Sequence, residues 1–487
     1  MFGIRSEMSL IKAFVSRAFS PIASTTVKST KKLVFLPLVG LAIVFLTFSG
    51  GDAGPMDCQA PDEWFTGPTK EPDASVAPTP QCGFHQWSWQ MFLFLTLPEG
   101  SEDRLAFMNM PPPSTMFETP KPNFAKLSLK SPLKLSASLA NTDKQLPFLE
   151  IEQAGKEIGV GSGILVHRNG RALYYSQHIN QRFFDFVVNN KLNDFDNFVK
   201  VAQDPKLQFP DGVLELKASW RIVEDGENTD SFFTTKAKVD RIKNVMVNGK
   251  TKVVVDPDAE PLQATVALTG LHVVGVVKGH PEFIWGTFEH NGNAPDLDPK
   301  TQPNQPVSIK DFTFYTANTK RADCNKGGLD TVTLDEMTQK LTPITNVARL
   351  NPRGGDTDQA IIKSLNDSVH AKLGNVPDAL KKNRALWKNY DLVGSVWLPG
   401  TPVVPGKDFS NDAVGSKKLA NATMETFKQA DPKNCFGCHT TQKADLPDGN
   451  GGVLVTLPAS NLNLSHALVN NLLLQKAKAN AAKKDGK

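Results

Sequence analysis

The sequence predicts an α+β fold, in which a β-rich N-terminal and middle domain is followed by a helical C-terminal region. Two patterns predict this class. Residues 158–290 alternate apolar and polar side chains between turn signals, and the chain after Leu329 repeats apolar side chains at helical spacing. The 487 residues are enough for two or three folded units. A net charge of +4 is too small to indicate nucleic-acid binding.

The first 50 residues have the pattern of an export signal. Residues 1–32 contain six Lys or Arg and a single acid, Glu7, and the 16 residues from Leu33 to Phe48 are almost without polarity. The small residues that follow suit signal cleavage, whereas an apolar run extended over residues 33–50 suits a retained membrane anchor. Because the basic flank stays inside, both alternatives predict that the rest of the chain lies in the periplasm.

Residues 51–83 are rich in Pro, Asp and Gly and predict a linker. Cys58 and Cys82 lie within it, and Cys324 lies far downstream. Any two of these three cysteines are candidates for a disulfide. A Cys58–Cys82 pair would leave Cys324 as a buried thiol.

Residues 84–400 are expected to form an α+β body of unknown role. Its first segment, FHQWSWQMFLFLTLP, predicts a buried helix in which His85, Trp87 and Trp89 are core residues. Residues 101–148 are rich in Pro and Ser and are expected to be irregular.

The strands of the body are marked by turns and by alternation. Asn169-Gly170 and Asn248-Gly249 each lie between two apolar runs, which predicts two β-hairpins. The runs ATVALTGLHVVGVV and EFIWGTFEH continue the β pattern, and residues 291–307 predict a loop. Alternation from Val213 to Val223 places these apolar side chains on one face: Leu214, Leu216, Ala218, Trp220 and Ile222.

Helices are predicted in three later segments. Apolar residues recur every fourth position in DQAIIKSLNDSVHAKLG, with Gly374 as the C-terminal cap. Residues 416–429 predict a helix that ends before Pro432, and residues 459–475 predict another that is capped by Ser460 or Asn461. The lysine-rich residues 476–487 are expected to form a disordered tail.

Cys435, Cys438 and His439 stand in the order Cys-x-x-Cys-His within the stretch NCFGCH. This spacing is typical of covalent c-type haem attachment, because two thiols reach the two vinyl groups while the next residue falls under the iron. A zinc half-site is the alternative, but zinc needs further ligands and no second Cys pair follows. The motif predicts one covalent haem c in residues 401–475, with His439 as the proximal ligand.

With this motif behind an export signal, the C-terminal part of the chain resembles the exported monohaem c-type cytochromes of bacteria. The resemblance covers roughly residues 410–475. It implies covalent haem, exposure to the periplasm, proximal ligation by His439 and redox chemistry.

The sequence does not determine which residue would occupy the second axial position of the iron. Small cytochromes c use a downstream Met, but no Met follows His439 in this sequence. His466 and Met424 are therefore candidate distal ligands, and a ligand from the upstream body or an open position are the alternatives. A His/Met pair would raise the reduction potential, whereas an open position would allow peroxide or a gas to bind.

Electron transfer with a redox partner protein is the leading functional prediction. The alternatives are a haem oxidoreductase or peroxidase with its substrate pocket in residues 84–400, and a haem-based sensor of a small molecule. Whether the chain is an enzyme stays open. His272, His280 and His290, with nearby acids, suit metal binding or acid/base chemistry beside a haem, or are simply polar residues at strand ends.

Overall fold

A computed structural model describes residues 57–99, 101–118, 133–137, 163–247, 249–327, 332–374, 376, 384–400, 402–430, 434–448 and 452–485. These residues mix helices and strands around one large sheet, so the predicted α+β class is confirmed. They belong to one compact unit, in which the segment carrying the Cys-x-x-Cys-His motif is packed with the sheet. The predicted leader over residues 1–50 lies outside the described residues.

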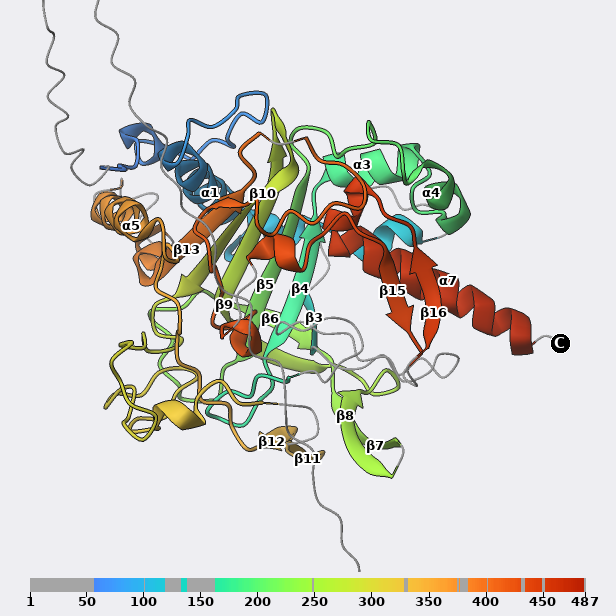
Figure 1. The fold of residues 1–487 in the computed structure, drawn as a ribbon. Coiled ribbons are helices and arrows are strands. Elements are labelled where there is room, and N and C mark those ends of the chain that lie inside the picture. Colours follow the sequence, from blue (N-terminus) through green and yellow to red (C-terminus); the bar gives the residue numbers. More distant parts are fainter. Residues whose placement is uncertain are drawn as a thin grey trace, which may run out of the picture. The chain divides into compact units, whose positions relative to one another are not determined.

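The central sheet has the strand order β14–β13–β10–β9–β5–β4–β3–β6 (Figure 1). Neighbouring strands are antiparallel except for the parallel pair β3 and β6. The bounds of its strands are β3 (Leu133–Ala137), β4 (Tyr174–Ile179), β5 (Leu214–Ile222), β6 (Thr234–Val239), β9 (Leu262–Val277), β10 (His280–His290), β13 (Tyr390–Trp397) and β14 (Val414–Gly415).

Smaller two-stranded sheets and helices surround the central sheet. The paired strands are β1 (Pro98–Glu99) with β2 (Ser101–Leu105), β7 (Ile242–Val247) with β8 (Lys250–Val255), β11 (Thr333–Asp335) with β12 (Lys340–Thr342), and β15 (Ala444–Pro447) with β16 (Val453–Leu457). The α-helices are α1 (Cys82–Leu95), α3 (Gln181–Asn189), α4 (Phe195–Val201), α5 (Gln359–Leu373) and α7 (His466–Asp485).

Alternation along the strands gives the sheet two different faces. The apolar residues predicted to share one face of β5 do so, in a core with residues of α1 and α5. The opposite face carries Glu215, Lys217 and Ser219 of β5, and packs with residues of α3, α4 and α7. Figure 1 shows α1 and α5 on one side of the sheet and α7, β15 and β16 on the other. We call the two faces the apolar face and the polar face.

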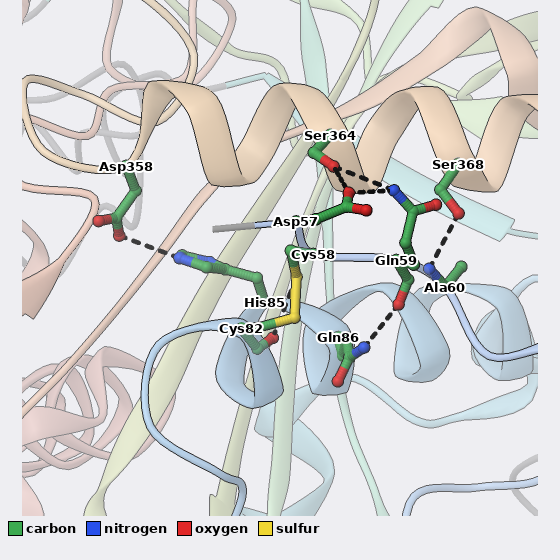
Figure 2. Close-up of a disulfide and its surroundings, with 10 residues drawn as sticks. All are labelled: Asp57, Cys58, Gln59, Ala60, Cys82, His85, Gln86, Asp358, Ser364 and Ser368. Carbon is green, nitrogen blue, oxygen red and sulfur yellow. Dashed lines mark hydrogen bonds and ion pairs between the residues drawn. A yellow bond between two sulfur atoms is a disulfide. The ribbon is translucent and has the colours of Figure 1, made fainter. Parts of the chain in front are cut away.

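The segment that follows the predicted leader is part of the folded body. Cys58 and Cys82 form a disulfide, which joins this segment to the start of α1 (Figure 2). The backbone N–H of Ala60 donates to Ser368 of α5 at 3.0 Å. The prediction of a linker is therefore wrong for residues 57–83, because the segment before Cys82 is docked on α1 and α5, and Cys82 and Gly83 belong to α1 itself. Closing a loop of this size restricts the unfolded chain and stabilises the fold by about 3 kcal/mol.

Several predicted elements are confirmed. Helix α1 begins at Cys82, and α5 ends at Leu373 with Gly374 as its cap. Around the Asn169-Gly170 turn, Val166 bridges Ala172. Strands β7 and β8 pair as a hairpin, although Asn248 of its turn lies outside the described residues. Within residues 101–148, expected to be irregular, the chain forms β2 and β3.

The predicted helix at residues 416–429 is wrong. This stretch is a series of turns, with one 3-10 turn over Thr426–Lys428. The side chain of Asn421 accepts the N–H of Thr423 at 2.9 Å, and the hydroxyl of Thr426 donates to the carbonyl of Ala422 at 2.6 Å. Such local bonds from Asn and Thr side chains compete with a helix, and the apolar spacing alone did not reveal them.

The C-terminal helix is displaced relative to its prediction. Residues Asn461–Leu464 form a 3-10 turn capped by Ser460, and α7 begins at His466. The helix continues to Asp485, so the expectation of a disordered tail is wrong for residues 476–485. Alanine and lysine favour a helix there, and Lys476 binds Asp196 of α4 at 2.6 Å. No helix in the described part of the chain is long and apolar enough to cross a membrane.

Candidate functional site

The Cys-x-x-Cys-His motif forms a single helical turn on the polar face. Its 3-10 turn, Cys435–Gly437, is capped by Asn434, whose side chain accepts the N–H of Phe436 at 3.0 Å. The N–H of His439 donates to the carbonyl of Cys435 at 2.9 Å, which closes the turn. Phe436 is fully buried and anchors the turn in the apolar cluster that includes Trp285.

The two motif cysteines form no disulfide and have different surroundings. Cys438 is exposed, whereas Cys435 is partly covered, and burial raises the pKa of its thiol. The described residues contain no group of three or more His, Cys, Asp or Glu placed to hold a metal ion. The three motif side chains therefore do not converge on a common ion, and the zinc alternative gains no support from this part of the chain.

His439 is held by one hydrogen bond and two ring contacts. Its Nδ1 lies 2.8 Å from the carbonyl oxygen of Leu464. A carbonyl only accepts hydrogen bonds, so Nδ1 must carry the proton and Nε2 keeps its lone pair. This is the second contact that metal-ligating histidines commonly make. The ring packs against Trp285 and against His466, with centroids 4.1 Å and 3.9 Å away.

The imidazoles at the motif are kept neutral by their surroundings. Burial lowers the pKa of His439 well below its usual value, and the neighbouring His466 and Lys217 lower it further. Burial likewise lowers the pKa of His466 to about 4. A metal ligand must present a neutral imidazole, so the chemistry of His439 suits iron ligation by Nε2.

His466 lies beside His439 rather than across from it. The two rings are stacked with an interplanar angle of 29°, and Nε2 of His466 lies 3.2 Å from the carbonyl of Cys438. An imidazole nitrogen binds a metal at about 2 Å, so two rings on opposite sides of one ion have centroids roughly 6 Å apart. A distal role for His466 therefore requires its ring to move from this position.

Met424, the other candidate distal ligand, is fully buried. It packs in a small apolar cluster with Tyr175 and Phe314, which shares no member with the cluster that holds Phe436. Its surroundings are those of a core methionine.

A row of polar side chains crosses the sheet beside the motif. Lys217, His272 and Thr287 are direct cross-strand neighbours on β5, β9 and β10. The two ring nitrogens of His272 lie 2.8 Å from the hydroxyl of Thr287 and 2.9 Å from the carboxylate of Glu425. Two residues further along β10, Trp285 contacts His439, so this row is adjacent to the motif.

Charges in this row are coupled. Burial would raise the pKa of Glu425, but His272, Lys217 and the N–H of Asn421 together hold it below its usual value. Burial lowers the pKa of Lys217. The side chains of His272 and Glu425 keep 19% and 32% of their surface exposed, so water reaches one edge of the row.

Glu215 occupies the next position on the polar face of β5. Its carboxylate accepts hydrogen bonds from the hydroxyl of Ser465 at 2.6 Å and from the N–H of Ala467 at 3.2 Å. The residue is 8% exposed, and burial raises the pKa of its carboxyl to about 7.

The other predicted residues are placed away from the motif. His280 bonds Glu282 at 2.8 Å, and His290 is buried against the carbonyl of Ser231 at 3.0 Å. Of the three histidines that the sequence grouped together, His272 is the one beside the motif. His85, Trp87 and Trp89 are buried as predicted, with His85 bound to Asp358 at 3.0 Å.

Sequence reasoning missed Glu215, Lys217 and Glu425. The signal was present in β5, where Glu215 and Lys217 are the polar positions of the alternating run, but such positions normally face solvent. Comparison with protein-family models, curated proteins and solved structures finds no match to this chain.

Proposed function

We propose that the chain is an exported monohaem c-type cytochrome that transfers electrons outside the cytoplasm. The observation that carries the proposal is the turn over residues 435–439. It combines two cysteines that form no disulfide with a histidine whose Nδ1 is bonded to a carbonyl and whose Nε2 keeps its lone pair. Cys435 and Cys438 would hold the porphyrin through thioether bonds, and His439 would be the proximal ligand. The haem supplies a one-electron redox centre.

Two features support the location in this proposal. The predicted leader directs the body out of the cytoplasm, either after cleavage or with residues 33–50 retained as an anchor. The Cys58–Cys82 disulfide is of a kind that persists in oxidising compartments such as the periplasm. A redox partner protein would deliver or accept the electron.

Covalent haem attachment is the direct test. The full chain is expressed in a bacterium with haem c maturation machinery, and the purified protein is denatured before haem and mass are measured. We expect one haem per chain to survive denaturation. Cys435→Ala and Cys438→Ala should each reduce covalent haem strongly, whereas the matched control Cys324→Ala should retain it. A wild-type chain that carries no covalent haem, or binds zinc in its place, contradicts the proposal.

A haem oxidoreductase is a second candidate, favoured by the row of Lys217, His272 and Glu425. These groups are partly open to water beside the motif and are suited to move protons to or from a bound molecule. Adding carbon monoxide, cyanide and peroxide to the haem-loaded chain separates the functions. An unchanged low-spin spectrum favours the electron carrier, and peroxide turnover favours the enzyme. Gas binding without turnover favours the sensor.

A further inference from the structure

Glu215 ties the start of α7 to the central sheet. Ser465 is the residue before α7, and its side chain accepts the N–H of Leu468 at 3.2 Å. The hydroxyl of Ser465 in turn donates to Glu215, which also accepts the N–H of Ala467. A carboxylate at this end of a helix is stabilised by the helix dipole as well as by these bonds. The first turn of α7 is thus fixed relative to β5.

The same short segment holds the motif. The carbonyl of Leu464 accepts the Nδ1–H of His439, and Nε2 of His466 lies against the carbonyl of Cys438. Residues 464–467 therefore contact the motif on one side and Glu215 on the other. The residues that link Glu215 to His439 are all buried: Ser465, Ala467 and Leu464.

We propose that Glu215 is a positioning residue for His439, because it holds the carbonyl that fixes the Nδ1–H tautomer and the direction of Nε2. This inference deepens the proposed function and rests on it for its redox readout. Hydrogen bonding at Nδ1 makes the imidazole a more basic ligand, and a more basic ligand favours ferric iron. Loss of the Glu215 contacts should therefore make the iron easier to reduce.

The first experiment needs no haem. The full chain is produced without haem, with ¹⁵N-labelled histidine, and the His439 signals are assigned with the variant His439→Asn. We expect the Nδ1–H tautomer in the wild type and a mixture of tautomers in Glu215→Ala. An unchanged tautomer in a folded Glu215→Ala variant overturns the positioning role, whether or not haem attachment is found.

The second experiment measures the midpoint potential of the haem-loaded chain. Glu215→Ala should shift the reduction equilibrium toward ferrous iron by about threefold to tenfold, where tenfold equals about 59 mV for one electron. Removing a negative charge would shift the potential in the same direction, so two further variants separate the causes. Glu215→Gln removes the charge but keeps an oxygen that accepts from Ser465. Ser465→Ala removes a contact and leaves the charge.

The expected order of shifts is Glu215→Ala first, then Ser465→Ala, with Glu215→Gln close to the wild type. A full shift in Glu215→Gln with none in Ser465→Ala would show that charge alone acts, and would overturn the proposal. Glu282→Gln is the matched control. Glu282 is also a buried carboxylate, 1% exposed, and its side chain contacts His280 and Leu398. Its backbone carbonyl accepts the indole N–H of Trp285, and this bond is kept when the side chain becomes Gln. Glu282→Gln should leave both the tautomer and the potential unchanged.

Discussion

The two faces of the central sheet are built from the same strands but are closed in different ways. On the apolar face, Phe288 of β10 stacks on Phe92 of α1 at 4.2 Å between centroids, and regular helices cover the strands. On the polar face, the turns of residues 416–429 lie against the sheet and need partners for their backbone groups. Side chains of the sheet supply them: Glu289 accepts the N–H of Ala422, and Tyr175 donates to the carbonyl of Thr423 at 2.9 Å.

The difference shows that polar positions of an alternating strand do not always face solvent. A helix satisfies its own backbone, so apolar side chains can close the face that it covers. The turns of residues 416–429 satisfy only part of their own backbone, and the buried N–H and C=O groups that remain require polar side chains opposite them. The polar residues of β5, β9 and β10 are therefore as structural as the apolar ones.

The largest loss of stability should come from a substitution on the apolar face. Phe288→Ala removes a fully buried ring that also contacts Trp89, and it should lower the free energy of unfolding by about 3–5 kcal/mol. Denaturant titration measures this change. Met337→Ala, at a side chain that is 94% exposed, is the control and should have little effect. A loss below about 1 kcal/mol in Phe288→Ala would contradict the tight packing of this face.

The polar face should be nearly as sensitive to loss of a charge. Arg349 donates to Glu289 at 2.9 Å, and both side chains are buried, at 1% and 0% exposed. Arg349→Met leaves the carboxylate without its charged partner and should destabilise the chain by about 3–5 kcal/mol. The double variant Arg349→Met with Glu289→Leu should be less damaging than the single one. An equal or larger loss in the double variant would show that the ion pair is not the cause.

Acidification tests the apolar face by a different route. Burial lowers the pKa of His178 from 6.5 to about 4. The unfolded chain therefore binds a proton first as pH falls, and stability is lost between about pH 6.5 and 4. The full difference is roughly 3 kcal/mol. His178→Asn should flatten the fall in unfolding free energy over this range, and parallel curves for variant and wild type would contradict the expectation.

On the polar face, the free energy of unfolding should change with pH in the opposite direction. Burial raises the pKa of Glu215 from 4.5 to about 7, so the folded chain keeps a proton that the unfolded chain releases. The contribution is fully present below about pH 4.5 and is lost as pH rises to about 7, by roughly 3 kcal/mol. Relative to Glu215→Gln, the wild type should lose stability over this interval. A wild type that gains stability relative to Glu215→Gln as the pH rises would contradict the prediction.

The smallest effect is expected at a site outside both faces. Lys363 and Asp367 form an ion pair on the surface of α5, with side chains 76% and 63% exposed. Lys363→Ala should change the free energy of unfolding by less than about 0.5 kcal/mol. A larger loss would show that α5 depends on surface charge as well as on its apolar contacts.

The sequence predicted the elements whose signals are local. The alternation of β5, the Asn169-Gly170 turn and the four-residue repeat of α5 each lie within a few positions, and each was found. The motif residues were also selected by their spacing alone, and their role in haem attachment stays a prediction. The turns at residues 416–429 were missed because Asn421 and Thr426 bond to neighbouring backbone, which the apolar pattern does not record.

The rest of the candidate site depends on contacts between distant residues. Glu215 meets Ser465 across 250 positions, and His272 meets Glu425 across 153. No local pattern marks such pairs. The pairing of Cys58 with Cys82 was likewise undecided, because three cysteines allow several bridges until the fold brings two of them together.

The position of the Cys58–Cys82 bridge also determines how the body carries tension. A pull on the chain before Cys58 passes through the sulfur atoms to Cys82 and then into α1, whose aromatic side chains are packed in the apolar core. Residues 59–81 lie outside this path and carry no load. If the leader tethers the protein to a membrane, the tether pulls on a covalent bond and a buried helix. The hydrogen bonds of Gln59 and Ala60 to α5 are spared, whereas the bond from Ser364 to Asp57 lies within the path.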